Sequence, residues 1–194
     1  AGKTTLVDMI LGLLEPTEGE IAIGERVLTS KNIAQWQRLI GYVPQTPYFT
    51  DDTIAANIAF GIASELVDMA AVEHAAELAS LRVTVERDMP KGYATMVGER
   101  GSRLSNGQRQ RLGIARALYR NPKLLVLDEA TNALDYETET AVLEAIERLS
   151  HRLTIIMIAH RRHTIEACDE VYEVADGLLR RMEKKQLQAG GLVP

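Results

Sequence analysis

The sequence predicts an α/β fold with a mostly parallel sheet, an antiparallel edge and an inserted helical subdomain. Two apolar, strand-sized runs at 124–127 and 153–158 are each followed by a helical pattern, at 137–149 and 164–167. Apolar strands that alternate with helices are typical of a parallel sheet covered by helices on both faces. The stretch 63–81 is instead rich in Ala, Glu and Leu at helical spacing and has no strand pattern.

The chain length of 194 residues suits one domain. We expect a core formed by residues 1–61 and 122–194, with the helical subdomain at about 62–121. Residues 20–23 and 27–28 alternate between apolar and polar around a Gly-Glu pair, which predicts the hairpin of the antiparallel edge.

Helix-breaking residues delimit the elements of the N-terminal part. A helix is predicted at 4–14, and Pro16 and Gly19 stop it. A short helix at 33–39 and a strand at 40–43 follow, and two prolines then interrupt the pattern.

The remaining elements are predicted by the same signals. Residues 53–59 form a short helix that ends at Gly61, and the glycines within 89–103 indicate a loop. A long helical pattern runs over 104–119, and a further strand is expected at 171–174.

Composition narrows the functional class. Hydrophobic residues make up 46% of the chain, which is enough for a packed core, and the formal net charge is −5. Because binding to nucleic acid needs a basic face, we expect no nucleic-acid partner. The single cysteine, Cys168, excludes an internal disulfide. No apolar run reaches the roughly 20 residues of a membrane span.

The string Ala1-Gly2-Lys3-Thr4-Thr5 resembles the second half of a phosphate-binding loop. Backbone N–H groups at a helix N-terminus bind phosphate oxygens, and the helix dipole adds to this. We expect Gly2, Lys3, Thr4 and Thr5 to bind nucleotide, with Lys3 at the β- and γ-phosphates and the Thr4 hydroxyl on Mg²⁺. The alternative is an ordinary capped helix, which this short string does not exclude.

A second candidate motif is the apolar run 124–127 with the carboxylates of Asp128 and Glu129 after it. Ligands bind at the carboxyl ends of the strands of a parallel sheet. Asp128 is expected to hold Mg²⁺, and Glu129 to orient and polarise the attacking water. The alternative is a strand end that is simply exposed to solvent. The Gly-Lys-Thr string upstream argues against it, because it gives the two carboxylates a partner.

The third motif is Leu104-Ser105-Asn106-Gly107-Gln108, at the start of the long helix. It offers a second helix N-terminus to phosphate, with the Ser105 hydroxyl and the Gly107 amide as ligands. Helix capping explains Ser105 alone but not the five-residue string.

At this string the sequence resembles the ABC ATPase family, whose Leu-Ser-Gly-Gly-Gln signature lies in a helical subdomain between the two other motifs. The resemblance covers nearly the whole chain. It implies that Ser105, Asn106, Gly107 and Gln108 bind the nucleotide of a partner subunit. Asn106 stands where the family has Gly, and Asn tolerates the left-handed backbone better than other non-glycine residues, so we expect the loop to survive.

The resemblance assigns three more site residues. Gln45 ends a segment, 41–45, that resembles the family's Q-loop, and it is expected to contact Mg²⁺ and the attacking water. Asp135 lies in a segment, Ala133-Leu134-Asp135, that resembles the D-loop, which meets the opposite subunit, and it is expected to bind nucleotide. Asn132, just before this segment, stands where Ser is commoner. His160 is expected near the γ-phosphate, as the switch histidine.

The family implies that ATP lies between the phosphate loop of one ATP-binding domain and the signature of a second, joined head to tail. The segment 95–101 resembles exporters, in which Glu99 would touch the coupling helices of a transmembrane domain. The alternative is an ordinary glycine-rich loop with exposed charges. We expect that domain upstream on the same chain, and the ATPase at the cytoplasmic face of the plasma (inner) membrane. The segments 32–37 and 50–54 are similar to transporters that flip lipid-linked glycans.

A soluble ABC-type ATPase acting on DNA or ribosomes is the alternative function. The acidic charge, the exporter-like segment around Glu99 and the lack of a long coiled-coil insert argue against it. Because a domain does not normally begin inside a phosphate loop, we expect this sequence to have been cut from a longer chain. The aromatic residue that stacks on adenine in the family is then missing, and the printed sequence is expected to hydrolyse ATP poorly.

Overall fold

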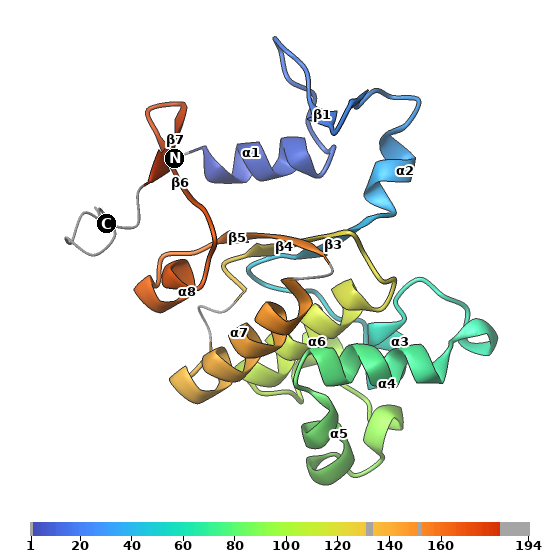
Figure 1. The fold of residues 1–194 in the computed structure, drawn as a ribbon. Coiled ribbons are helices and arrows are strands. Elements are labelled where there is room, and N and C mark those ends of the chain that lie inside the picture. The colour runs from blue at the N-terminus through green and yellow to red at the C-terminus, as the bar shows by residue number, and fades with distance from the viewer. Residues whose placement is uncertain (1, 131–133, 151–152, 183–194) are drawn as a thin grey trace. The chain divides into compact units, whose positions relative to one another are not determined.

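The computed structural model describes residues 2–130, 134–150 and 153–182. These fold into two compact units (Figure 1). One comprises the described residues within 1–38 and 160–194, and the other comprises those within 39–159. Ala1, Asn132 and Ala133 lie outside the described residues, so the predictions made for them stay predictions.

The centre of the second unit is a parallel sheet, as the apolar strand pattern predicts. Strand β4 (Leu124–Asp128) lies between β3 (Ile40–Val43) and β5 (Thr154–Ile158), and both pairings are parallel. Residues 124–127 of β4 are buried, which explains their continuous run of apolar side chains. The register pairs Leu127 with Val43 on one side and with Met157 on the other.

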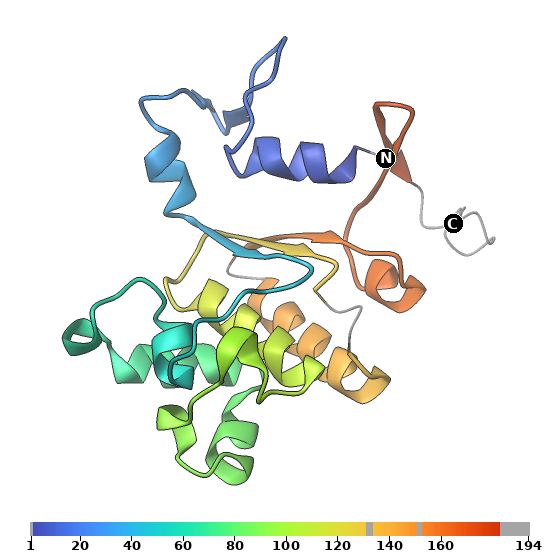
Figure 2. The same cartoon turned by 180° about the vertical axis from the view of Figure 1, so that it is seen from behind.

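Helices are the other regular elements in the described part of this unit. The α-helices are α3 (Ile54–Ile58), α4 (Met69–Leu78), α5 (Arg82–Asp88), α6 (Asn106–Leu118) and α7 (Tyr136–Ser150). Three short 3-10 helices lie between them: η1 (Ser64–Leu66), η2 (Gly92–Ala94) and η3 (Glu99–Gly101). Helices α6 and α7 cover one face of the sheet (Figures 1 and 2). The elements from α3 to α6 are all helical. The helical subdomain expected at 62–121 stays a prediction.

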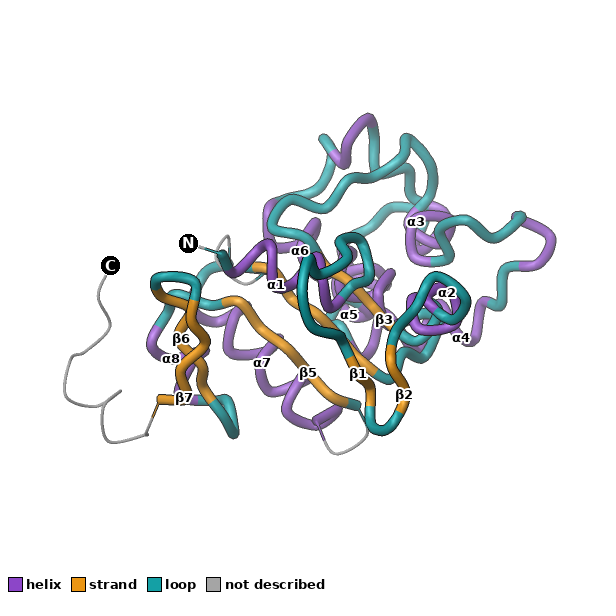
Figure 3. Tube along the Cα trace, turned by 90° about the horizontal axis from the view of Figure 1, so that it is seen from above, coloured by secondary structure: helices purple, strands orange, loops and turns teal. Residues whose placement is uncertain are grey.

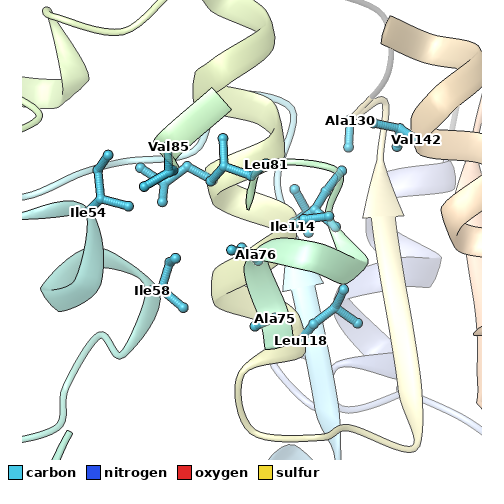
Figure 4. Packing of buried hydrophobic residues seen from close by; sticks show 14 of the residues in the cluster. Ile54, Ile58, Ala75, Ala76, Leu81, Val85, Ile114, Leu118, Ala130 and Val142 are labelled. Atoms are coloured by element: carbon cyan, nitrogen blue, oxygen red, sulfur yellow. The ribbon is translucent and has the colours of Figure 1, made fainter. Parts of the chain in front are cut away.

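The core of this unit is built from small and aliphatic side chains of several helices (Figure 4). Ala75 and Ala76 of α4 lie against Ile114 and Leu118 of α6, so the two helices approach closely. Close packing of this kind fixes the direction of α6, whose N-terminus carries the predicted signature.

Arg116 joins α6 to the chain that follows β3. Its guanidinium lies over the rings of Phe49 and Phe60, with centroid distances of 4.7 and 4.8 Å. It donates to the backbone oxygens of Tyr48 at 2.6 Å and Asn57 at 2.8 Å. Burial lowers the pKa of Arg116 to about 10, so the group is still protonated at neutral pH.

The first unit contains three helices and two antiparallel strand pairs in its described part. The helices are α1 (Lys3–Ile10), α2 (Ile33–Gln37) and α8 (Arg162–Glu166). The predicted hairpin is confirmed as β1 (Ala22–Ile23) and β2 (Arg26–Val27). Within this unit, the indole Nε1 of Trp36 donates to the backbone oxygen of Ile10 at 2.7 Å.

The strand expected at 171–174 exists as β6 (Val171–Ala175), but its partner was not predicted. It pairs antiparallel with β7 (Leu178–Met182), as the two adjacent strands in Figure 3 show. The turn between them has positive φ at Asp176 (52°) and Gly177 (74°). An Asp-Gly pair between apolar runs is a strong hairpin signal, so the sequence did contain the information.

Candidate functional site

The predicted phosphate loop leads into α1. Gly2 precedes the helix with φ of 113°, a backbone conformation that residues with a Cβ rarely adopt. No side chain among the described residues caps this helix, and its first turn contains no acidic residue. Thr4 and Thr5 are exposed. The N–H groups of this turn therefore suit an anionic ligand such as a phosphate group.

Two predicted site residues meet within the first unit. The ammonium Nζ of Lys3 lies 2.9 Å from Nε2 of His160, across 157 positions of sequence. Because a protonated lysine can only donate, the imidazole accepts through Nε2. The structure thus brings together the predicted phosphate ligand and the predicted switch histidine.

The carboxylate pair lies at the carboxyl end of β4 in the second unit. Asp128 is the last residue of the strand, and Glu129 turns out of it with φ of 51°. The N–H of Glu129 still donates to the backbone oxygen of Ile158 at 3.1 Å, which anchors this turn to β5. A non-glycine residue at positive φ is uncommon and is found preferentially at functional sites.

Gln45 and Glu129 are in direct contact. The Nε2 of Gln45 donates to Oε2 of Glu129 at 2.8 Å. The backbone oxygen of Gln45 in turn accepts from Nε2 of Gln110 at 3.0 Å. Gln110 was not singled out from the sequence, although a glutamine on the apolar stripe of a helix is a detectable signal.

The donor set of this unit fits Mg²⁺. Asp128 supplies a carboxylate, and the Gln45 Nε2 contact leaves its Oε1 oxygen to act as a ligand. In the described part of the chain, no three His, Cys, Asp or Glu side chains gather into a metal site. Mg²⁺ needs no such cage, because it usually binds one or two protein oxygens together with phosphates and water.

The signature forms the predicted helix N-terminus. Ser105 caps α6: its Oγ accepts from the N–H of Gln108 at 3.2 Å, and Gln108 Oε1 accepts from the N–H of Ser105 at 2.9 Å. This is a capping box, which satisfies two N–H groups of the first turn.

The expectation that Asn106 needs a left-handed backbone conformation is wrong. Asn106 is the first residue of α6 and does not have a positive φ, so the loop needs no left-handed residue there. With Ser105 as the cap, the next residue takes helical angles. The Asn106 Oδ1 accepts from the guanidinium of Arg109, which also donates to the backbone oxygens of Gly101 and Leu104.

The other predicted residues lie on the surface of the second unit. Asp135 is exposed directly before α7, while its neighbour Leu134 is buried. Glu99 is exposed in η3.

Comparison with known proteins adds a family assignment to this geometry. The profile of the family described as "ABC transporter" matches residues 1–132, which include the phosphate loop, the signature and the carboxylate pair. The chain belongs to the ABC transporter family. With this membership, the α/β fold is the ABC ATPase fold, and the domain is an ATP-binding domain of this family.

Similar proteins are much longer than this chain. An "ATP-dependent lipid A-core flippase" of Ralstonia nicotianae is 45% identical over 179 residues, which are 91% of this chain and 30% of the flippase. The "Multidrug resistance protein pgp-1" of Caenorhabditis elegans is 42% identical over 178 residues, 92% of this chain and 13% of that protein. The chain therefore spans about a third or less of these relatives.

A solved structure of a bacterial Atm1-family ABC exporter with ATP bound has a TM-score of 0.88 and 36% identity. The match covers 99% of this chain and 34% of that exporter. Within the described residues, no helix is long and apolar enough to cross a membrane.

Proposed function

We propose that this domain is the ATP-hydrolysing motor of an ABC exporter, and that Glu129 polarises the attacking water. The observation that carries the proposal is the Gln45–Glu129 hydrogen bond of 2.8 Å, which holds the carboxylate beside the side chain expected to contact the same water. The positive φ of Glu129 turns its side chain out of the line of β4.

Each remaining site residue has a proposed role. Lys3 neutralises the phosphates of ATP with its ammonium group, and its present contact with His160 is one that a phosphate oxygen can replace. Gly2 and Thr5 present N–H groups at the start of α1, and His160 donates a hydrogen bond to the γ-phosphate.

Mg²⁺ is the proposed metal, and when bound it would neutralise charge on the phosphates of ATP. Thr4 would contribute its hydroxyl, Asp128 its carboxylate and Gln45 its Oε1. These residues supply the hard oxygen ligands that Mg²⁺ prefers. Their own task is to hold those oxygens in place: Gln45 through its two hydrogen bonds, and Asp128 through its position at the end of β4.

The partner of this domain is proposed to be a second ATP-binding domain, joined head to tail. Ser105, Asn106, Gly107 and Gln108 would then face the partner's nucleotide, and Asp135 would lie near the contact. The observation in favour is that Ser105 and Asn106 are exposed at the uncovered N-terminal end of a 13-residue helix. Such an end attracts an anion.

Coupling to transport is proposed from the relatives. Those reported above are named as a flippase, a multidrug resistance protein and an ABC exporter, and none of them is named for DNA or ribosomes. We therefore propose a transmembrane domain as the second partner, with Glu99 at its coupling helices and the ATPase at the cytoplasmic face of the membrane. Lipid-linked glycans are the proposed cargo class, from the flippase relatives.

The experiment that tests this function uses the full-length protein in lipid vesicles. ATP hydrolysis and movement of a labelled lipid-linked glycan between leaflets are measured in parallel for the wild type and for Glu129→Gln. Both activities are expected in the wild type, and both are expected to be lost in the variant. Hydrolysis without lipid movement would support the ATPase and overturn the proposed cargo.

A further inference from the structure

We infer that Gln110 of α6 is a positioning residue for ATP hydrolysis: it holds Gln45, and through Gln45 it places Glu129. The observation behind this is a chain of two hydrogen bonds, from Gln110 Nε2 to the Gln45 backbone oxygen and from Gln45 Nε2 to Glu129. The inference rests on the proposed function, because it assigns Gln110 a part in hydrolysis at Glu129.

The burial of Gln110 argues for a specific task. The residue is 5% exposed, and its Nε2 donates the hydrogen bond to the backbone oxygen of Gln45. Its Oε1 is buried without a hydrogen-bond partner in the described part of the chain. A buried polar atom left unpaired destabilises a fold, so an apolar side chain of equal size would suit the core better. The glutamine is therefore explained by the contact that it makes with Gln45.

The orientation of the amide follows from chemistry. The backbone oxygen of Gln45 can only accept a hydrogen bond, so the amide nitrogen of Gln110 must face it. The reverse orientation would bring two oxygens to 3.0 Å of each other. A donor is therefore required at this position, which makes the contact sensitive to substitutions that keep the size but remove the N–H group.

The helix that carries Gln110 lies tightly against segment 41–47. A Cβ on Gly113 would lie 2.9 Å from Cγ of Pro47, and a Cβ on Gly41 would lie 2.6 Å from the backbone oxygen of Ala117. The glutamine lies on the same face, three residues before Gly113. Close contact along two turns of helix means that α6 and this segment move together.

This arrangement ties the signature to the hydrolytic carboxylate of the same chain. Ser105 caps α6, and Gln110 lies one and a half turns further along the same helix. When α6 is displaced, Gln110 moves with it and shifts the backbone of Gln45. The Gln45 carboxamide then moves relative to Glu129. Gln110 therefore places Gln45 correctly for hydrolysis only when α6 is in its proper position.

The test is the substitution Gln110→Met in the full-length protein. Methionine keeps the length and the burial but has no N–H group to donate. We expect kcat for ATP to fall about 10-fold to 100-fold, because misplacing a catalytic group costs rate. The KM for ATP and the equilibrium Kd for ATP are expected to stay within about twofold, because Gln110 does not touch nucleotide.

A matched control is Ile114→Val on the same helix. Ile114 is buried on the side of α6 that faces α4 (Figure 4), and the loss of one methyl group weakens core packing without reaching Gln45. We expect lower thermal stability and unchanged kcat. An equal fall of kcat in both variants would show a general effect of stability and overturn the inference.

A double-mutant cycle tests whether Gln110 acts through the Gln45 side chain. In a Gln45→Ala background, Gln110→Met is expected to lower kcat by less than about twofold, because the group being positioned is already gone. Independent, multiplicative effects of the two substitutions would overturn the inference. If Gln110→Met does not fold, Gln110→Leu serves instead, since its side chain has no group that can donate, and unchanged kcat in that variant would count against the proposal.

The outcome for Glu129→Gln distinguishes a failure of the proposed function from a failure of the role proposed for Gln110. If that variant hydrolyses ATP at the wild-type rate, the proposed function fails. If it is inactive while Gln110→Met matches the wild type, the proposed function stands and only the role of Gln110 is overturned.

Discussion

The carboxamide of Gln45 donates a 2.8 Å hydrogen bond to the carboxylate of Glu129, which lies 84 positions further along the chain. Strands β3 and β4 are parallel neighbours, so the residues that follow them emerge at the same edge of the sheet. Gln45 follows β3 and Glu129 follows β4. The sheet register therefore creates this pair, which forms the proposed hydrolytic part of the site.

The substitution Glu129→Gln is expected to abolish turnover and to leave ATP binding intact. The side chain keeps its size, but it can no longer accept a proton from water, and loss of a general base lowers rates by roughly 10²-fold to 10⁴-fold. Phosphate release and equilibrium ATP binding are measured on the full-length protein. The control is Glu144→Gln, an exposed glutamate on α7. Wild-type turnover in the Glu129 variant would remove Glu129 from the mechanism.

The substitution Lys3→Ala is expected to weaken ATP binding by about 10-fold to 100-fold, as calorimetry would measure. A hydrogen bond to a charged group contributes roughly 1.5–3 kcal/mol, and Lys3 engages the phosphates already before hydrolysis. Lys31→Ala is the matched control, since Lys31 is an exposed lysine of the same unit. Equal affinities for the Lys3 variant and the wild type would place Lys3 outside the site.

The substitution Ser105→Asp separates the capping role of Ser105 from its proposed contact with nucleotide. Aspartate is as good an N-cap as serine, so α6 and the melting temperature should be unchanged. A carboxylate there would repel the phosphates of a partner's ATP. In a Glu129→Gln background, size-exclusion chromatography with ATP is expected to show monomers, while Ser105→Thr still gives dimers. A dimer of the Asp variant would argue that the signature is not at the interface.

The substitution Arg116→Ala is expected to lower the free energy of unfolding by about 2–4 kcal/mol, because the backbone oxygens of Tyr48 and Asn57 lose a buried donor. The contacts with two aromatic rings are lost as well. Thermal unfolding measures the change, at roughly 2–4 °C per kcal/mol for a protein of this size. Arg120→Ala, at an exposed arginine just after the same helix, should change stability by less than about 0.5 kcal/mol. Equal melting temperatures for both variants would contradict the structural role of Arg116.

Most elements follow from local sequence. Strand β3 covers the predicted residues 40–43, and the capping box of α6 begins at the predicted signature. Hydrophobic spacing and helix caps act over a few residues, so they can be read without knowing the fold. The β6–β7 hairpin follows from local sequence as well, because Asp176 and Gly177 form a turn signal between its two strands.

By itself, the sequence determined the fold class, the order of the motifs and the residue types available for phosphate and metal binding. Tertiary structure decided which of these meet: Lys3 with His160 across 157 positions, and Gln45 with both Glu129 and Gln110. Such contacts depend on strand register and on how closely α6 lies against β3. These are properties of packed backbones, and the pattern of a single segment contains no information about them.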